Sequence, residues 1–118
     1  MKRFIVLLML FALQSYAVSV HLINDSPYDL VAEIQTATGR ILGNVSLSPG
    51  KDIRWNKDIS TMNQSESITP LIVAWKCAYG GYYSVCSDVS VGASVSASLC
   101  DGSKSCRPNP KQDNKDQN

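Results

Sequence analysis

The chain has 118 residues, with 11 Lys plus Arg against 10 Asp plus Glu and a formal net charge of +1. This length corresponds to one domain. The charges are balanced and scattered along the chain, which excludes the concentrated basic surface that binds nucleic acid.

The N-terminus has the layout of a secretory signal peptide. Lys2 and Arg3 precede an unbroken apolar run at residues 4–13, and a small residue, Ala17, follows at a suitable cleavage position. The apolar run is too short to span a membrane. We therefore predict a signal peptide over residues 1–17 and a protein that is secreted or periplasmic after cleavage near Ala17; an uncleaved N-terminal anchor is the alternative. Removing Lys2 and Arg3 leaves nine basic residues against ten acidic ones, so the mature net charge is −1.

Four stretches in the first half of the mature chain have the two-residue period of half-buried strands. We predict strands at residues 18–22, 28–34, 41–47 and 53–55. In the third strand we expect the buried face to consist of Ile41, Gly43, Val45 and Leu47, and in the fourth of Ile53 and Trp55. Turn-forming residues separate these strands, as in Asn24-Asp25-Ser26-Pro27 and Ser48-Pro49-Gly50-Lys51.

The second half begins with a polar loop at residues 56–67 and continues with three more predicted strands. Leu71–Trp75 is continuously apolar, as in a strand covered on both faces, and Tyr82–Val85 is its expected hairpin partner. Val89–Leu99 has an apolar residue at every odd position and Ser or Gly at every even one, which predicts a strand. We expect this strand to be central, because exposed edges usually carry protective charges. The alternative is an edge strand, which could accept a strand from a partner or from a second copy of the chain.

Four cysteines, at positions 77, 86, 100 and 106, lie in the second half of the chain. Their spacing does not match paired zinc knuckles, so we expect no metal site. An even number of cysteines in an exported chain predicts disulfides. Of the three pairings, we favour Cys77–Cys86 with Cys100–Cys106, because each closes a short loop.

Seven short strands, turn residues between them and no amphipathic helix predict a small antiparallel β-sandwich over residues 18–106, held by disulfides. A small β-barrel is the alternative. The polar residues 107–118 have too little apolar content to pack, so we predict a disordered tail there.

No residue pattern indicates catalysis or a cofactor. His21 is the only histidine, and its predicted strand position favours an ordinary structural role. The serines lie outside the sequence contexts of known nucleophiles. We therefore expect a protein that is not an enzyme, with a small secreted enzyme as an alternative.

The stretch CAYGGYYSVC, residues 77–86, combines two cysteines, a Gly-Gly turn and three tyrosines. The glycines suit a tight hairpin, and at least one of Tyr79, Tyr82 and Tyr83 should be exposed near its tip. Exposed aromatic rings suit recognition. We expect a binding module that recognises a protein, a glycan or an envelope component through this tip or through a sheet edge. The alternative is a membrane-active protein in which Trp55 joins these tyrosines in an aromatic rim.

Overall fold

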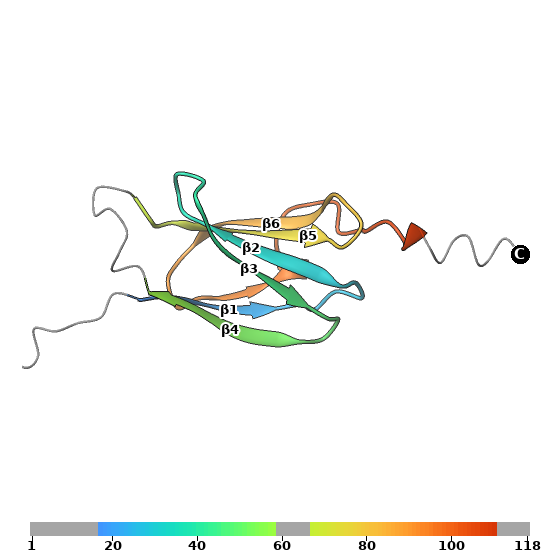
Figure 1. The fold of residues 1–118 in the computed structure, drawn as a ribbon, viewed down its shortest axis with the longest axis horizontal. Coiled ribbons are helices and arrows are strands. Elements are labelled where there is room, and N and C mark those ends of the chain that lie inside the picture. The colour runs from blue at the N-terminus through green and yellow to red at the C-terminus, as the bar shows by residue number, and fades with distance from the viewer. Residues whose placement is uncertain (1–16, 59–66, 111–118) are drawn as a thin grey trace, which may run out of the picture.

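The computed structural model describes residues 17–58 and 67–110 and contains two packed β-sheets (Figure 1). The strands are β1 (Ala17–Ile23), β2 (Leu30–Gln35), β3 (Ile41–Leu47), β4 (Asp52–Asp58), β5 (Leu71–Cys77), β6 (Tyr82–Val89) and β7 (Ser94–Ser96), and a short 3-10 helix, η2 (Ala97–Leu99), follows. The predicted signal peptide, except Ala17, and tail residues 111–118 lie outside the described residues.

One sheet has the order β3-β2-β5-β6 and the other has the order β4-β1-β7. All pairs are antiparallel except β1 and β7, which are parallel. The predicted disulfide-held sandwich is therefore confirmed, with one parallel pair that the sequence analysis did not anticipate. The predicted polar loop starts later than expected, because residues 56–58 complete β4, and residues 59–66 lie outside the described part.

The core lies between the sheets and is built from alternate residues of the central strands. Leu22, Leu30 and Ile34 are almost completely buried, and each such side chain stabilises the fold by roughly 1.5–3 kcal/mol. Trp75 of β5 is the largest fully buried side chain. β5 is buried at five of its seven positions, and Ile72 is the one residue of the apolar run Leu71–Trp75 that is not fully buried.

The predicted face of β3 is wrong at its first residue. Ile41 is 53% exposed, whereas Leu42 is buried. The cause is a register shift in the β2–β3 pair, where Ile34 pairs with Gly43 but Gln35 pairs with Ile41. Such an irregularity reverses the sides of the sheet on which the residues at the start of β3 lie. On β4, Ile53 is also exposed, because β4 is an edge strand.

The eleven-residue strand predicted at Val89–Leu99 is wrong. The chain turns after Val89, where Gly92 has a φ of 85° and donates its N–H to the Ser19 carbonyl at 2.7 Å. Only Ser94–Ser96 then form a strand, β7, which lies at an edge of its sheet and not in the centre. The alternating sequence predicted a continuous strand because glycine at an even position fitted the pattern, whereas its left-handed φ breaks the strand.

The predicted cysteine pairing is also wrong: the disulfides are Cys77–Cys106 and Cys86–Cys100. Two register shifts in the β5–β6 pair place Cys86 opposite Val73, so it does not face Cys77. The chain after η2 instead returns along β6, where Asp101 forms an isolated bridge with Val85. Each disulfide thus joins the hairpin to this returning segment and helps to cover the outer edge of β6.

Candidate functional site

The β5–β6 turn carries the exposed aromatic side chains. Gly80 and Gly81 both have positive φ, as the tight turn requires, and the Cys77 N–H donates to the Gly81 carbonyl at 2.9 Å. Tyr79 is 48% exposed and Tyr82 is 55% exposed, which confirms the expectation of exposed tyrosines near the tip.

Tyr82 lies beside a charged pair on the outer face of the four-stranded sheet. The Lys76 ammonium is 5.9 Å from the Tyr82 ring centroid and 3.0 Å from Oε2 of Glu33. The hydrogen bond to Glu33 raises the pKa of Lys76. Lys76 therefore remains charged and partly covers one side of the Tyr82 ring.

Tyr83 is not a surface residue, contrary to the binding role predicted for it. It is only 4% exposed and packs against Tyr28, with ring centroids 5.9 Å apart and planes inclined by 59°. Burial, followed by the charge of Asp25 and the Tyr28 hydroxyl, raises the pKa of Tyr83. Tyr83 supports the tip from the core.

Trp55 lies away from the tyrosines. It is half-buried on β4, and its ring covers Gly43 of β3 so closely that a Cβ there would be 2.9 Å from Trp55 Cζ2. Since β3 and β6 form opposite edges of their sheet, Trp55 is separated from the β5–β6 turn. The four predicted aromatic residues therefore do not form one rim.

A pocket of 290 Å³ opens beside Tyr79, where three chain segments meet. The connection between β1 and β2 and the β5–β6 turn lie at the same end of the sandwich, where the C-terminal segment also emerges (Figure 1). The lining residues are Pro27, Tyr28, Asp29, Ala78, Tyr79, Cys106, Arg107, Pro108 and Asn109. We call these residues the tip pocket.

The sequence analysis missed the tip pocket because it assigned residues 107–109 to the tail. The Cys77–Cys106 disulfide holds the start of this segment against the end of β5, with the two Cα atoms 5.6 Å apart. Only the correct cysteine pairing would have revealed from the sequence that these residues adjoin Tyr79.

A buried asparagine fixes the other wall of the tip pocket. Asn24 is completely buried, and its Nδ2 donates to the carbonyls of Tyr28 and Leu47, both at 2.8 Å. Its Oδ1 accepts hydrogen bonds from the Ser26 N–H at 3.0 Å and the Ser26 hydroxyl at 2.6 Å. This network holds the backbone of Tyr28 against the end of β3, so the pocket wall is preformed.

The next residue, Asp25, lies between β1 and β2 and forms hydrogen bonds with η2. Its carboxylate accepts hydrogen bonds from the N–H and the hydroxyl of Ser98. Burial acts to raise the pKa of Asp25, but the two hydrogen bonds from Ser98, the backbone N–H of Asp25 and the charge of Lys104 together outweigh it, and the pKa is lowered overall.

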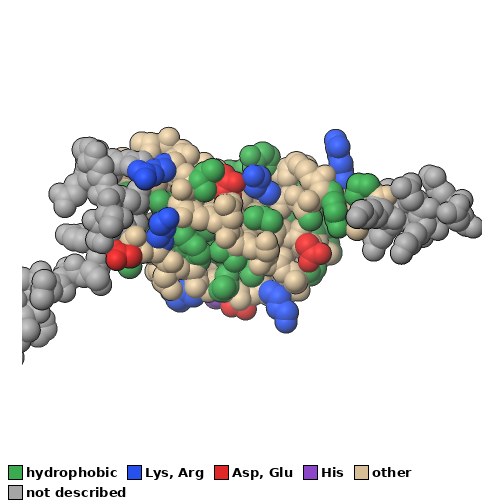
Figure 2. All heavy atoms as spheres, viewed as in Figure 1, with side chains coloured by type: hydrophobic (Ala, Val, Ile, Leu, Met, Phe, Trp, Pro, Cys, Tyr) green, Lys and Arg blue, Asp and Glu red, His purple; other side chains and the backbone are tan. Residues whose placement is uncertain are grey.

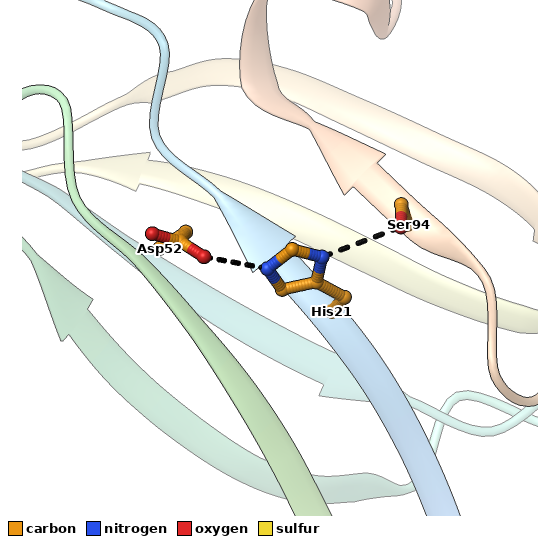
Figure 3. A network of polar contacts seen from close by, with 3 residues as sticks. All are labelled: His21, Asp52 and Ser94. Carbon is orange, nitrogen blue, oxygen red and sulfur yellow. Dashed lines mark hydrogen bonds and ion pairs between the residues drawn. The ribbon is translucent and has the colours of Figure 1, made fainter.

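His21, expected to be an ordinary strand residue, joins two polar neighbours (Figure 3). Its Nε2 lies 2.7 Å from Oδ2 of Asp52 on β4, and its Nδ1 lies 3.3 Å from the hydroxyl of Ser94 on β7. The carboxylate only accepts, so Nε2 carries a proton, and in the neutral ring the Ser94 hydroxyl donates to Nδ1. The cluster links all three strands of its sheet.

Serine, histidine and aspartate are also the residues of a hydrolytic triad, in which a buried aspartate orients the histidine. Here the Asp52 side chain is 59% exposed and the His21 side chain is 27% exposed. Water therefore competes for the carboxylate that would have to orient the ring. We interpret the cluster as a structural hydrogen-bond network that helps to hold the three-residue strand β7 in its sheet.

The predicted sheet-edge site corresponds to β7. A shallow groove of 260 Å³ lies between β6 and β7, and the neighbouring Leu99 is 83% exposed. Ser94 lies on this groove as well as in the His21 cluster. The edge is thus a second exposed surface, separate from the tip pocket.

On the face shown in Figure 2, the acidic and basic side chains are scattered among apolar and uncharged ones. Within residues 17–58 and 67–110, no helix has the length and apolar character needed to cross a membrane. Comparisons of the chain with protein-family models, curated proteins and solved structures gave no match.

Proposed function

We propose that this protein is an exported binding module, not an enzyme, and that it binds its ligand at the tip pocket. The observation that carries the proposal is the placement of Tyr79, which is 48% exposed at the margin of a 290 Å³ pocket. An exposed ring beside a concave site offers contact area that needs little side-chain ordering on binding.

The construction of the pocket supports this proposal. One wall is held by the Cys77–Cys106 disulfide and the other by the Asn24 hydrogen bonds. A preformed site loses less conformational entropy when a ligand binds. The two disulfides also indicate an oxidising, extracytoplasmic compartment. Cleavage near Ala17 and release to the periplasm or the medium complete the proposal.

The ligand classes are a protein, a glycan or another envelope component, with no cofactor and no nucleic acid. A membrane-active function is less well supported, because Trp55 and Tyr83 do not join Tyr79 and Tyr82 in an exposed rim. A hydrolytic function is less well supported because Asp52 is exposed to water.

Cosedimentation with envelope fragments of the producing cells tests the proposal. The mature protein is labelled at its N-terminus, which lies at the opposite end of the sandwich from the tip (Figure 1). We expect Tyr79→Ala to weaken binding at least tenfold. The matched control is Tyr82→Ala, which removes an exposed tyrosine that does not line the pocket and should leave binding unchanged.

Four outcomes would overturn the proposal. Equal binding by wild type and Tyr79→Ala would exclude the tip pocket, and loss of binding in Ser94→Lys alone would place the ligand at the β7 edge. Equal recovery with protein-free lipid vesicles would favour the membrane-active alternative. Hydrolysis of a p-nitrophenyl ester that disappears in His21→Ala with the fold intact would show an enzyme.

A further inference from the structure

We infer that the tip pocket is a carbohydrate site, in which one sugar ring packs on Tyr79 while its hydroxyls bond with Asp29 and Arg107. This inference rests on the proposed function and names its ligand class.

The size of the pocket favours a single small ring. Pockets for drug-sized ligands have volumes of roughly 300–1,000 Å³. The tip pocket, at 290 Å³, is slightly smaller than the lower limit of that range. It is too small for an extended peptide segment with several side chains, whereas one sugar unit fits this scale and leaves the rest of a chain in solvent.

Four of the apolar residues that line the pocket have ring side chains. Tyr28 and Tyr79 come from two different connections, and Pro27 and Pro108 lie beside them. Tyr28 is further fixed by its contact with the buried Tyr83. Flat aromatic faces suit a ligand that presents a patch of C–H groups, as one face of a pyranose ring does.

The polar part of the lining can accept hydrogen bonds from sugar hydroxyls and can donate hydrogen bonds to them. An ionised Asp29 only accepts hydrogen bonds, and Arg107 only donates them. Neither forms an ion pair with another residue in the described part of the chain. A sugar hydroxyl both donates and accepts, so neighbouring hydroxyls on one ring can bond with both side chains.

The same charges disfavour other ligand classes. An anion attracted by Arg107 would be repelled by Asp29, and a cation attracted by Asp29 would be repelled by Arg107, so the two effects oppose each other for a ligand of either sign. A purely apolar ligand would take water from both side chains without replacing its hydrogen bonds, which is costly. A neutral ring with many hydroxyls satisfies both charged groups and the aromatic walls together.

Ligand-observed saturation-transfer NMR tests the inference with the methyl glycosides of glucose, galactose, mannose and N-acetylglucosamine. For a ligand of this size, a Kd on the order of 1 mM is expected from typical affinities per atom. We expect at least one glycoside to bind. In protein-observed amide spectra, the same glycoside should shift the signals of Asp29, Ala78 and Tyr79. Tyr79→Ala should weaken this binding at least tenfold, whereas Tyr79→Phe, which keeps the ring, should change it less than threefold.

Two further variants, Asp29→Asn and Tyr82→Ala, are measured in the same binding experiment. Asp29→Asn should weaken binding severalfold by replacing a charged acceptor, and Tyr82→Ala should have no effect. If no glycoside binds at 20 times the expected Kd, or if Tyr79→Ala binds as wild type does, the carbohydrate inference is wrong. If envelope fragments still require Tyr79 in that case, the proposed function stands and only the ligand class falls.

Discussion

Asn24 is the residue whose replacement we expect to damage both the sandwich and its tip. It is completely buried directly after β1, and all four hydrogen bonds of its side chain are made within the protein. Its amide joins the Tyr28 backbone to Leu47 at the end of β3. Asn24→Ala removes the amide, while Asn24→Asp keeps its shape and loses only the two donors.

The magnitude follows from those four bonds. A hydrogen bond contributes about 0.5–1.5 kcal/mol net, and a buried partner left unsatisfied costs about 1–3 kcal/mol. Asn24→Ala leaves the carbonyls of Tyr28 and Leu47 without these donors, so we expect a loss of roughly 3–5 kcal/mol. A domain of this size is stable by only about 5–15 kcal/mol, so the variant is close to unfolding.

Asn24→Asp separates hydrogen bonding from shape. An ionised carboxylate cannot donate, and it would face the carbonyl oxygens of Tyr28 and Leu47 at about the distance of the present bonds, 2.8 Å. We therefore expect Asn24→Asp to be at least as destabilising as Asn24→Ala at neutral pH.

Urea denaturation followed by tryptophan fluorescence measures the free energy of unfolding of the wild type and both variants. Ser26→Ala is the control, because it removes a hydroxyl from the same network but keeps both bonds from Asn24 to the carbonyls. It should cost less than either change at Asn24. A free energy of unfolding for Asn24→Asp within 1 kcal/mol of the wild-type value, on the scale of one hydrogen bond, would refute the reasoning.

Three further predictions concern the segment that returns along β6 and its contacts. Gly102→Ala should destabilise the fold by about 1–3 kcal/mol, because a Cβ there would lie 2.5 Å from the Tyr83 carbonyl oxygen; thermal unfolding equal to that of Ser103→Ala would contradict this. Replacing both Cys77 and Cys106 by alanine opens a loop with a sequence separation of 29 and should cost about 3.6 kcal/mol in the chain-entropy treatment, and peptide mapping that links Cys77 to Cys86 would refute the pairing. The lowered pKa of Asp25 stabilises the fold above its unfolded pKa of about 3.9, and this contribution disappears as the pH falls through the folded pKa. Asp25→Asn should therefore reduce the loss of stability as the pH falls below about 4, and parallel pH profiles of variant and wild type would contradict this.

The sequence by itself determined the fold class and most of the strands. Alternation in β1 and β2 and the apolar run in β5 each correspond to one local backbone geometry, and the core residues follow from it. The turn at Gly80-Gly81 and its exposed tyrosines were predictable for the same reason, since positive φ and a short loop are local properties.

Only the tertiary structure decided the register, the disulfides and the sites. Cysteine pairing depends on where strands end after register shifts, and the bulges in β5–β6 separate Cys77 from Cys86. The tip pocket needs residues from the β1–β2 connection, the β5–β6 turn and the chain after Cys106, and the His21 cluster needs Asp52 and Ser94 from two other strands. Periodicity describes which way one segment faces, whereas contacts between distant segments depend on how the two sheets pack, and no single stretch of sequence carries that information.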